Sequence, residues 1–174
     1  VDDLICTGTP QVLKALNALL TTDFTVGTRE DAADPAGVLY RGSRIKSKRK
    51  GQLSIDMKEY EKREVSPCRY KFDTKRTRAT KKDTETVLDA KGQEWYRAIV
   101  GKLIWISCQV RADLQTQTSQ AASSLGRATV ADAIKINSLI DQCEKRKIAL
   151  QFKCLTPKTN RRSLKVCCDA AFKN

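Results

Sequence analysis

The segment from Gly92 to Gln109 constrains the fold most, because apolar side chains recur along it at the spacing of a helix. One stripe consists of Trp95, Ile99, Leu103 and Ile106, and other sides carry Val100, Ile104 and Trp105. A helix that is apolar on more than one side is buried on more than one side. We therefore predict a long, largely buried helix over residues 92–109, with other elements packed around it.

Two further helices are predicted directly after it. The first covers residues 113–125, and its inward side chains are Leu114, Ala121, Ala122 and Leu125. The second opens at Thr129, which Asp132 follows at the spacing of a capping pair. Its predicted inner face consists of Ala133, Ile136, Leu139, Ile140 and Cys143. Together the three segments predict a helical unit.

The first part of the chain alternates strand and helix signals. Val1–Cys6 is typical of a strand entered in mid-element, as expected of a chain cut from something longer. Thr9 is a typical N-cap with proline after it, so a helix should run over Pro10–Leu20. A strand over Phe24–Gly27 should follow.

A basic hairpin is predicted next. The strand Val38–Ile45 leads into a basic turn, Lys46–Gly51, and then into the partner strand Gln52–Ile55. Asp56 is a suitable cap for a short helix through Glu64.

Residues 65–90 show no apolar period and are predicted to be loop. Strand signals return at Ile148–Leu155 and Leu164–Cys168. Strands at both ends and helices between them predict an α+β fold.

The positive charge of the chain is concentrated in one stretch. Of a formal net charge of +13, residues 41–82 contribute +11, from sixteen basic and five acidic side chains. A clustered basic stripe is typical of contact with a phosphate backbone. The alternative is a solvated loop whose charge has no ligand.

Histidine is absent from the sequence. This excludes Ser-His-Asp and Cys-His hydrolases, HExxH metalloproteases and C2H2 zinc fingers, which need an imidazole as base or ligand. The seven cysteines form no C-x-x-C pair. We therefore expect free, mostly buried thiols in a reducing compartment inside the cell, and without a run of about 18 apolar residues we expect no membrane association.

Three aspartates are candidate metal ligands. Asp2 and Asp3 are adjacent at the start of an apolar strand, where like charges repel unless a cation lies between them. Asp169 ends the strand Leu164–Cys168. Each aspartate taken alone also fits an ordinary turn or strand end. Carboxylates of this kind hold the two ions of nucleotidyl transfer, so Mg²⁺ is the expected cofactor.

Other polar and aromatic residues have structural interpretations. Asp113 fits an N-cap, with Arg111 as its partner. Trp95, Tyr96 and Trp105 could stack on bases, but at helical spacing they are more often part of a core.

Taken in order, these landmarks resemble the reverse transcriptase and ribonuclease H part of copia-type retrotransposon Pol polyproteins. The run Val1–Gly8 resembles the family's Tyr-Val-Asp-Asp turn and strand, with the tyrosine before Val1. Glu94–Trp105 is similar to its Tyr-Arg-x-Leu-Ile-Gly-x-Leu-x-Trp/Tyr box, and Val166–Asn174 resembles the start of its ribonuclease H domain. The segment after the box departs from the family, because Ala112 stands where the family has proline.

The resemblance implies three parts. Residues 1–56 would be the C-terminal part of the polymerase palm, with antiparallel strands and a helix. Residues 57–147 would be the thumb and connecting helices, with the basic loop at 65–90. Residues 148–174 would be the truncated start of a ribonuclease H-like domain.

The resemblance also implies site residues and partners. Asp2 and Asp3 would hold Mg²⁺ for RNA-directed DNA synthesis, and Asp169 would hold it for ribonuclease H. The partners would be an RNA template, a DNA primer, their RNA–DNA hybrid, deoxynucleotides and the remainder of the Pol polyprotein. The location would be the cytoplasm or a virus-like particle, with the nucleus as a third site. Nucleic-acid contacts are expected from the hairpin, at Arg41, Arg44, Lys46, Lys48, Arg49 and Lys50.

Two other functions stay open at this point. One is a non-catalytic basic nucleic-acid-binding module or a decayed transposon relic, and the other is a helical interaction domain built on residues 92–146. Because a two-metal site takes ligands from several strands, we expect neither active site to be complete in this chain alone.

Overall fold

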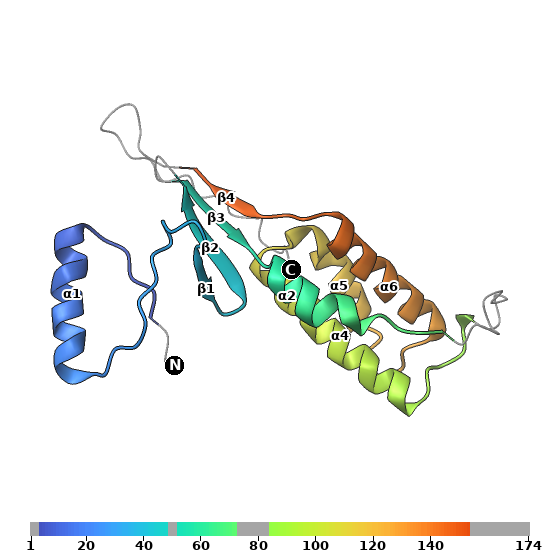
Figure 1. The fold of residues 1–174 in the computed structure, drawn as a ribbon. Helices are drawn as coiled ribbons and strands as arrows, with labels where there is room; N and C mark the ends of the chain where they lie inside the picture. Colours follow the sequence, from blue (N-terminus) through green and yellow to red (C-terminus); the bar gives the residue numbers. More distant parts are fainter. Residues whose placement is uncertain (1–3, 49–51, 73–83, 154–174) are drawn as a thin grey trace, which may run out of the picture.

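The computed structural model describes residues 4–48, 52–72 and 84–153. Within these ranges the fold is α+β, as predicted: an antiparallel sheet lies beside a helical unit, and one further helix stands apart from both (Figure 1).

The sheet has four strands in the order β1-β2-β3-β4. The strands are β1 (Val38–Tyr40), β2 (Ser43–Lys48), β3 (Gln52–Asp56) and β4 (Leu150–Phe152). Every neighbouring pair is antiparallel. The predicted pairing of the basic strand with Gln52–Ile55 is confirmed, with Ile45 opposite Ile55. The last strand returns from the helical unit to pair with β3, so residues before and after the helices share one sheet.

The prediction of one continuous strand over Val38–Ile45 is wrong, because a tight turn divides it. Tyr40 pairs with Ser43, and the two turn residues, Arg41 and Gly42, have φ of 50° and 82°. Positive φ at both central positions defines the turn type that matches the twist of a two-residue hairpin. Glycine takes this conformation without strain, so Gly42 was the available sequence signal.

A helical segment follows the sheet, close to the predicted one. It consists of α2 (Lys58–Tyr60), a π-helical turn η2 (Glu61–Val65) and a 3-10 turn η3 (Ser66–Cys68). The N-cap position is held by Met57, one residue after the predicted cap Asp56, and no side chain caps this helix. The carboxylate of Asp56 still accepts a hydrogen bond from the N–H of Lys58 at 3.3 Å.

The loop predicted over residues 65–90 is only partly correct. Val65 is fully buried, Leu88 is buried, and Tyr70 and Phe72 pack against the core. Apolar residues at irregular spacing thus hold this segment against the core. Residues 73–83 lie outside the described ranges.

The three predicted helices are confirmed. They are α4 (Ala90–Gln109), α5 (Gln115–Ala122), which a 3-10 turn η5 (Ala112–Leu114) precedes, and α6 (Val130–Lys145). Asp89 caps α4 through the N–H of Gly92, and Thr129 with Asp132 forms the predicted capping box of α6. Each cap satisfies backbone N–H groups that a helix start leaves free.

The core lies among α4, α5, α6 and η2. All five residues of the predicted inner face of α6 are buried, as are Ile99, Val100, Leu103 and Ile106 of α4. The sheet joins this core at one end, where Ile55 and Leu150 pack against it. The rest of the sheet extends beyond the helices (Figure 1).

The helix α1 (Pro10–Asp23) has the predicted start, with Thr9 as N-cap and Pro10 in the first turn. It stands away from the sheet and the helical unit (Figure 1), and Val12 and Leu19 are 55% and 64% exposed. The strands predicted over Val1–Cys6 and Phe24–Gly27 are not seen: Leu4–Cys6 and Phe24–Gly27 have no regular structure, and residues 1–3 lie outside the described ranges. A strand needs a neighbour to pair with, and neither segment has one within the described chain.

None of the helices in the described ranges has the length and apolar character needed to cross a membrane.

Candidate nucleic-acid interface

The three predicted metal ligands, Asp2, Asp3 and Asp169, lie outside the described residues. Within the described ranges, no group of three or more His, Cys, Asp or Glu side chains is arranged to hold a metal ion. The predicted Mg²⁺ site therefore stays a prediction, and no catalytic step is derived from it.

Two of the predicted nucleic-acid-binding residues make contacts within the protein. The guanidinium of Arg44 donates to the carbonyl of Ala36 at 2.6 Å and forms an ion pair with Glu59 at 2.5 Å. The ammonium of Lys46 donates to the carbonyl of Pro35 at 3.1 Å. These hydrogen bonds hold the segment just before β1 against β2. Both side chains are therefore less available to a ligand than the sequence suggests. Lys48 ends β2, and Arg49 and Lys50 lie outside the described residues.

Arg41 has a different environment. Its side chain is exposed at the hairpin turn, and its guanidinium carbon lies 5.6 Å from the ring centroid of Trp105 on α4. A guanidinium at this distance from an aromatic ring is attracted to the ring face. The contact brings the tip of the β1–β2 hairpin against α4.

The exposed side of α4 extends this contact along the helix. Arg97, Gly101 and Trp105 are four residues apart and therefore lie on one side of α4. Arg97 and Gly101 are exposed and Trp105 is half-buried. Apart from its chain neighbours and the nearby backbone of α4 itself, no atom of the described chain lies within 4 Å of the position where a Cβ on Gly101 would stand. A ligand can therefore approach the helix backbone closely at this point. We call Arg41, Arg97, Gly101 and Trp105 the α4 surface.

Of the α4 surface, sequence reasoning named Arg41 and raised Trp105 as a residue that could stack on bases, but it missed Arg97 and Gly101. A signal was present, because glycine inside a long helix costs about 1 kcal/mol relative to alanine and so marks an unusual position. Packing gives no reason for Gly101.

The core interpretation of the other aromatic residues is confirmed. Tyr96 is only 1% exposed, and its hydroxyl donates to the carbonyl of Ala121 at 2.9 Å. Trp95 donates from its indole N–H to the carbonyl of Cys68 and packs on the ring of Tyr70 at 4.7 Å.

Arg111 lies at the centre of a buried ion-pair network. It is 0% exposed, and it donates two hydrogen bonds to Asp113, at 2.9 and 3.1 Å, and one to Glu61 at 2.9 Å. The predicted pairing with Asp113 is confirmed, but Asp113 caps no helix, since its carboxylate is used by Arg111. Glu61, from η2, was not predicted because it lies far away in the sequence.

Burial sets the protonation of this network. It raises the pKa of the Glu61 carboxyl, against the opposing hydrogen bond from Arg111. Burial alone would lower the pKa of Arg111, but the hydrogen bonds to Asp113 and Glu61 outweigh it and raise that pKa. Arg111 is therefore a charged structural residue that ties η2 to the α4–α5 connection.

The four described cysteines are free, and the expected burial holds for one of them; Cys154, Cys167 and Cys168 lie outside the described residues. Cys143 is buried, Cys68 is half-buried, and Cys6 and Cys108 are exposed. Burial raises the pKa of the Cys143 thiol to about 12, so this thiol stays protonated and unreactive.

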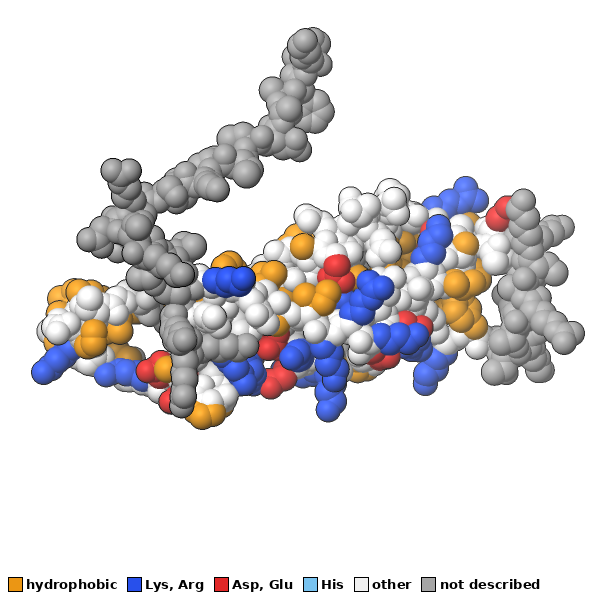
Figure 2. All heavy atoms as spheres, turned by 90° about the horizontal axis from the view of Figure 1, so that it is seen from above, with side chains coloured by type: hydrophobic (Ala, Val, Ile, Leu, Met, Phe, Trp, Pro, Cys, Tyr) orange, Lys and Arg blue, Asp and Glu red, His pale blue; other side chains and the backbone are white. Residues whose placement is uncertain are grey.

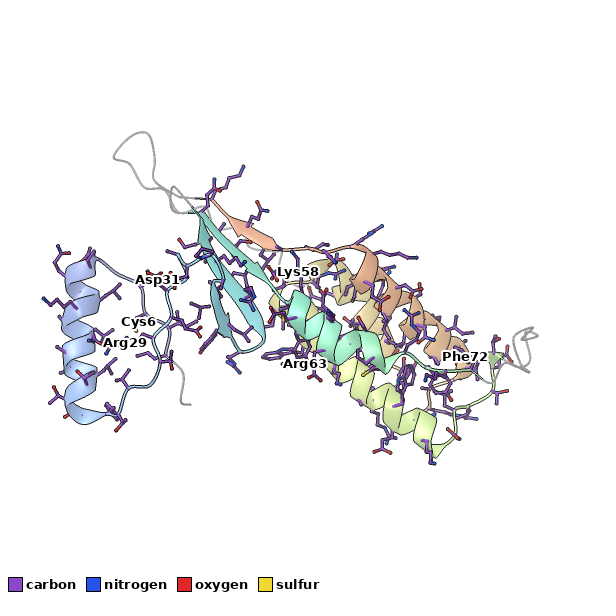
Figure 3. All side chains as sticks on the ribbon, viewed as in Figure 1. Cys6, Arg29, Asp31, Lys58, Arg63 and Phe72 are labelled. Carbon is purple, nitrogen blue, oxygen red and sulfur yellow. The ribbon has the colours of Figure 1, made fainter. Side chains whose placement is uncertain are left out.

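Positive charge is distributed over the outer surface of the molecule. Lys and Arg side chains run along one long edge of the face shown in Figure 2, with several Asp and Glu among them. Lys58 and Arg63 are exposed side chains of the α2–η2 segment, and their labels lie at opposite edges of this segment in Figure 3. Salt bridges to Glu59, Glu64, Asp141 and Glu144 neutralise part of this charge.

A scan against models of known protein families finds no match for this chain, and searches among curated proteins and solved structures find no similar protein.

Proposed function

We propose that the chain is a segment of an RNA-directed DNA polymerase with ribonuclease H from a copia-type retrotransposon polyprotein, and that it binds the primer–template duplex through the α4 surface. The observation that carries the binding proposal is the contact between Arg41 and Trp105. It joins the basic hairpin to the exposed side of α4 in one continuous surface.

The chemistry of the α4 surface suits a nucleic-acid duplex. Arg41 and Arg97 are both exposed and carry cations for phosphates; the Nε of Arg97 donates to the carbonyl of Leu125 at 3.3 Å, which leaves its two terminal nitrogens for a ligand. Gly101 leaves the helix backbone open to a sugar or base edge, and Trp105 adds a flat apolar face beside it. A surface with cations at its ends and a neutral centre fits the backbone and shallow groove of an RNA–DNA hybrid.

The catalytic part of the proposal rests on the motif resemblance. In that resemblance Asp2, Asp3 and Asp169 would hold Mg²⁺, and the other ligands would come from the rest of the Pol polyprotein. The described residues would then contribute duplex binding and positioning.

The proposal is tested by measuring the binding of a labelled RNA–DNA hybrid by fluorescence anisotropy over a range of salt concentrations. Arg41→Glu should weaken binding and should lower the slope of log K against log salt by about one, since each phosphate contact contributes about 0.9 to that slope. Unchanged affinity and slope for this variant would show that the hairpin turn does not contact the nucleic acid.

Lys135→Glu is the matched control, because it makes the same charge change at an exposed position on α6. It should alter the affinity and the salt slope much less than Arg41→Glu. Equal effects of the two variants would indicate a general dependence on net charge and would favour the simpler basic binding module. Failure of the unmodified chain to bind any hybrid would favour the helical interaction domain.

A further inference from the structure

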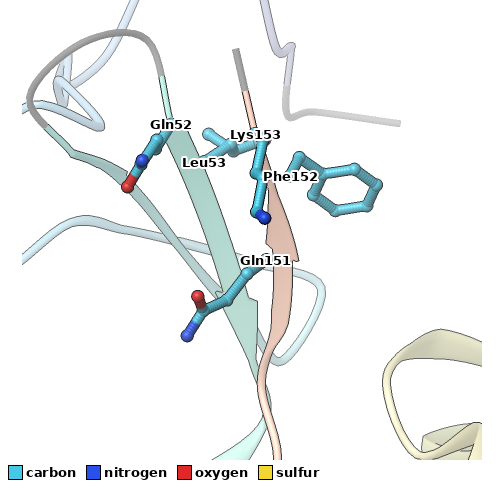
Figure 4. Close-up of a pocket in the computed structure, with 5 residues that line it drawn as sticks. All are labelled: Gln52, Leu53, Gln151, Phe152 and Lys153. Carbon is cyan, nitrogen blue, oxygen red and sulfur yellow. The ribbon is translucent and has the colours of Figure 1, made fainter. Parts of the chain in front are cut away.

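The shallow hollow beside β4 lacks the side chains that a reaction needs. Its volume is about 40 Å³, and the described residues that line it, shown in Figure 4, are Gln52, Leu53, Gln151, Phe152 and Lys153. None of these described residues carries a thiol or a carboxylate. A thiol, an amine and a carboxylate meet instead where the end of the α2–η3 segment contacts α4, at Cys68, Lys102 and Glu64.

Cys68 and Lys102 are in direct contact. Nζ of Lys102 lies 3.4 Å from Sγ of Cys68, which is the separation of two atoms positioned to react with each other. Among the four described cysteines, Cys68 alone accepts a hydrogen bond from a described lysine. Cys68 is half-buried and the Lys102 side chain is 31% exposed. The pair therefore lies at the rim of the core, within reach of a small solute.

Other bonds hold both atoms in place. The thiol of Cys68 donates to the carbonyl of Glu64 at 3.0 Å, and the carbonyl of Cys68 accepts from the indole of Trp95. The ammonium of Lys102 donates to the same Glu64 carbonyl at 3.1 Å and pairs with the Glu64 carboxylate at 3.2 Å. Burial alone would lower the pKa of Lys102, but its hydrogen bonds to Glu64 and Cys68 outweigh burial and raise that pKa. The nitrogen is therefore charged at rest, with a carboxylate beside it.

We propose that Cys68 and Lys102 form an oxidation-sensitive clasp, in which hydrogen peroxide converts their contact into a covalent sulfur–nitrogen bond. The sulfur first takes one oxygen atom from the peroxide and becomes a sulfenic acid, and the rest of the peroxide leaves as water. Sulfenic acids condense with nitrogen. The nitrogen of Lys102 then bonds to the sulfur, and the sulfenic hydroxyl leaves with one ammonium proton as a second water.

The electrons and the remaining proton are accounted for. The sulfur loses two electrons, and the peroxide accepts them. The second proton that the ammonium releases passes through the Glu64 carboxylate, 3.2 Å from the nitrogen, to solvent. Two thiols from solution reverse the reaction, because they become a disulfide and return Cys68 and Lys102 to their original forms.

The bond ties η3 to α4 across 34 positions of the sequence. A cross-link of this kind stabilises a fold mainly by restricting the unfolded chain. Oxidation should therefore make the helical unit harder to unfold, and reduction should reverse the gain. This inference goes beyond nucleic-acid binding and does not depend on it.

The test exposes the full chain to hydrogen peroxide, removes the excess with catalase and alkylates the remaining thiols. Peptide mass spectrometry should then find the peptides of Cys68 and Lys102 joined, at a mass two hydrogens below the sum of the separate peptides. Dithiothreitol should release them. The midpoint of urea unfolding should rise on oxidation and return on reduction.

Two variants and a second cysteine serve as controls. Lys102→Arg keeps a positive charge but removes the amine, so it should lose the link and leave Cys68 as a sulfenic acid that dimedone traps. Lys91→Arg makes the same change at an exposed lysine on α4 and should keep the link. Cys108, exposed on the same helix, should be oxidised without forming a link to a lysine.

Oxidised Cys68 without a bond to Lys102 in the unmodified chain would overturn the inference, and this result needs no variant to fold. Absence of oxidation at Cys68 would overturn it too. So would lysine links that form equally at Cys108, because the contact would then not direct the reaction. If the link formed but no nucleic acid bound, only the proposed function would fail, and the reverse result would leave that function in place.

Discussion

Removal of the buried cation Arg111 should cost more stability than loss of any surface charge. Arg111 is 0% exposed, and Glu61 is 7% exposed with Arg111 as its ion-pair partner. Arg111→Met would leave the Glu61 carboxylate buried and unpaired, and breaking a buried pair in this way costs about 3–5 kcal/mol. For a chain of this size that corresponds to a fall in the unfolding temperature of about 10 °C or more.

The assay is urea and thermal unfolding followed by circular dichroism. The double variant Arg111→Met, Glu61→Met removes the two buried charges and leaves the carboxylate of Asp113, which is 28% exposed and reaches solvent. It should recover most of the lost stability, because an apolar pair of similar volume often replaces a buried ion pair without cost. Arg63→Met breaks the exposed pair with Glu64 and should leave the midpoint unchanged. A loss below about 1 kcal/mol for Arg111→Met would refute the reasoning, since it would mean that Glu61 is solvated or paired elsewhere.

Two more predictions follow from the same geometry. The pKa of Glu61 is raised by burial, so its contribution to stability is fully present below its unfolded pKa and is lost as the pH rises through its folded pKa. The unfolding midpoint of the unmodified chain should therefore improve relative to Glu61→Gln as the pH is lowered from 7 to 4, and a constant difference would contradict the raised pKa. Gly42→Ala should cost about 1–2 kcal/mol in urea unfolding, because φ is 82° and the new Cβ would lie 3.2 Å from the ring of Tyr60; a neutral result would show that the hairpin turn relaxes.

Local signals predicted the helical unit well. The capping box at Thr129 and the inner face from Ala133 to Cys143 both depend on residues three or four apart, and both are confirmed. Arg111 and Asp113 are two residues apart, so their pairing could also be predicted.

Long-range pairings could not be predicted from such signals. The partner of β3 is β4, on the far side of the helical unit in the sequence, and Glu61 reaches Arg111 through the fold. Cationic hairpin residues looked free for a ligand, but the structure pairs Arg44 with Glu59 and with a backbone carbonyl. In each case the deciding contact comes from a segment that sequence periodicity does not place.

The apolar signals of the first thirty residues overstated the strand content. Leu4, Ile5, Phe24 and Val26 are exposed, and α1 presents Val12, Leu13 and Leu19 to solvent. Strand propensity expresses itself only when a neighbouring strand supplies hydrogen bonds. Among the described residues, no strand pairs with Leu4–Cys6 or with Phe24–Gly27.

The measurement that tests the central claim most directly is the effect of Gly101→Leu on stability and on hybrid binding together. Apart from its chain neighbours and the nearby backbone of α4, the described structure has no atom within 4 Å of a Cβ at this position, so folding should be unaffected or stabilised by about 0.5–1 kcal/mol. The same side chain would obstruct the approach of a duplex to the backbone of α4. We expect an unfolding midpoint at or above that of the unmodified chain, together with at least tenfold weaker binding of the RNA–DNA hybrid. Unchanged binding by a stably folded Gly101→Leu chain would contradict the placement of the duplex on α4.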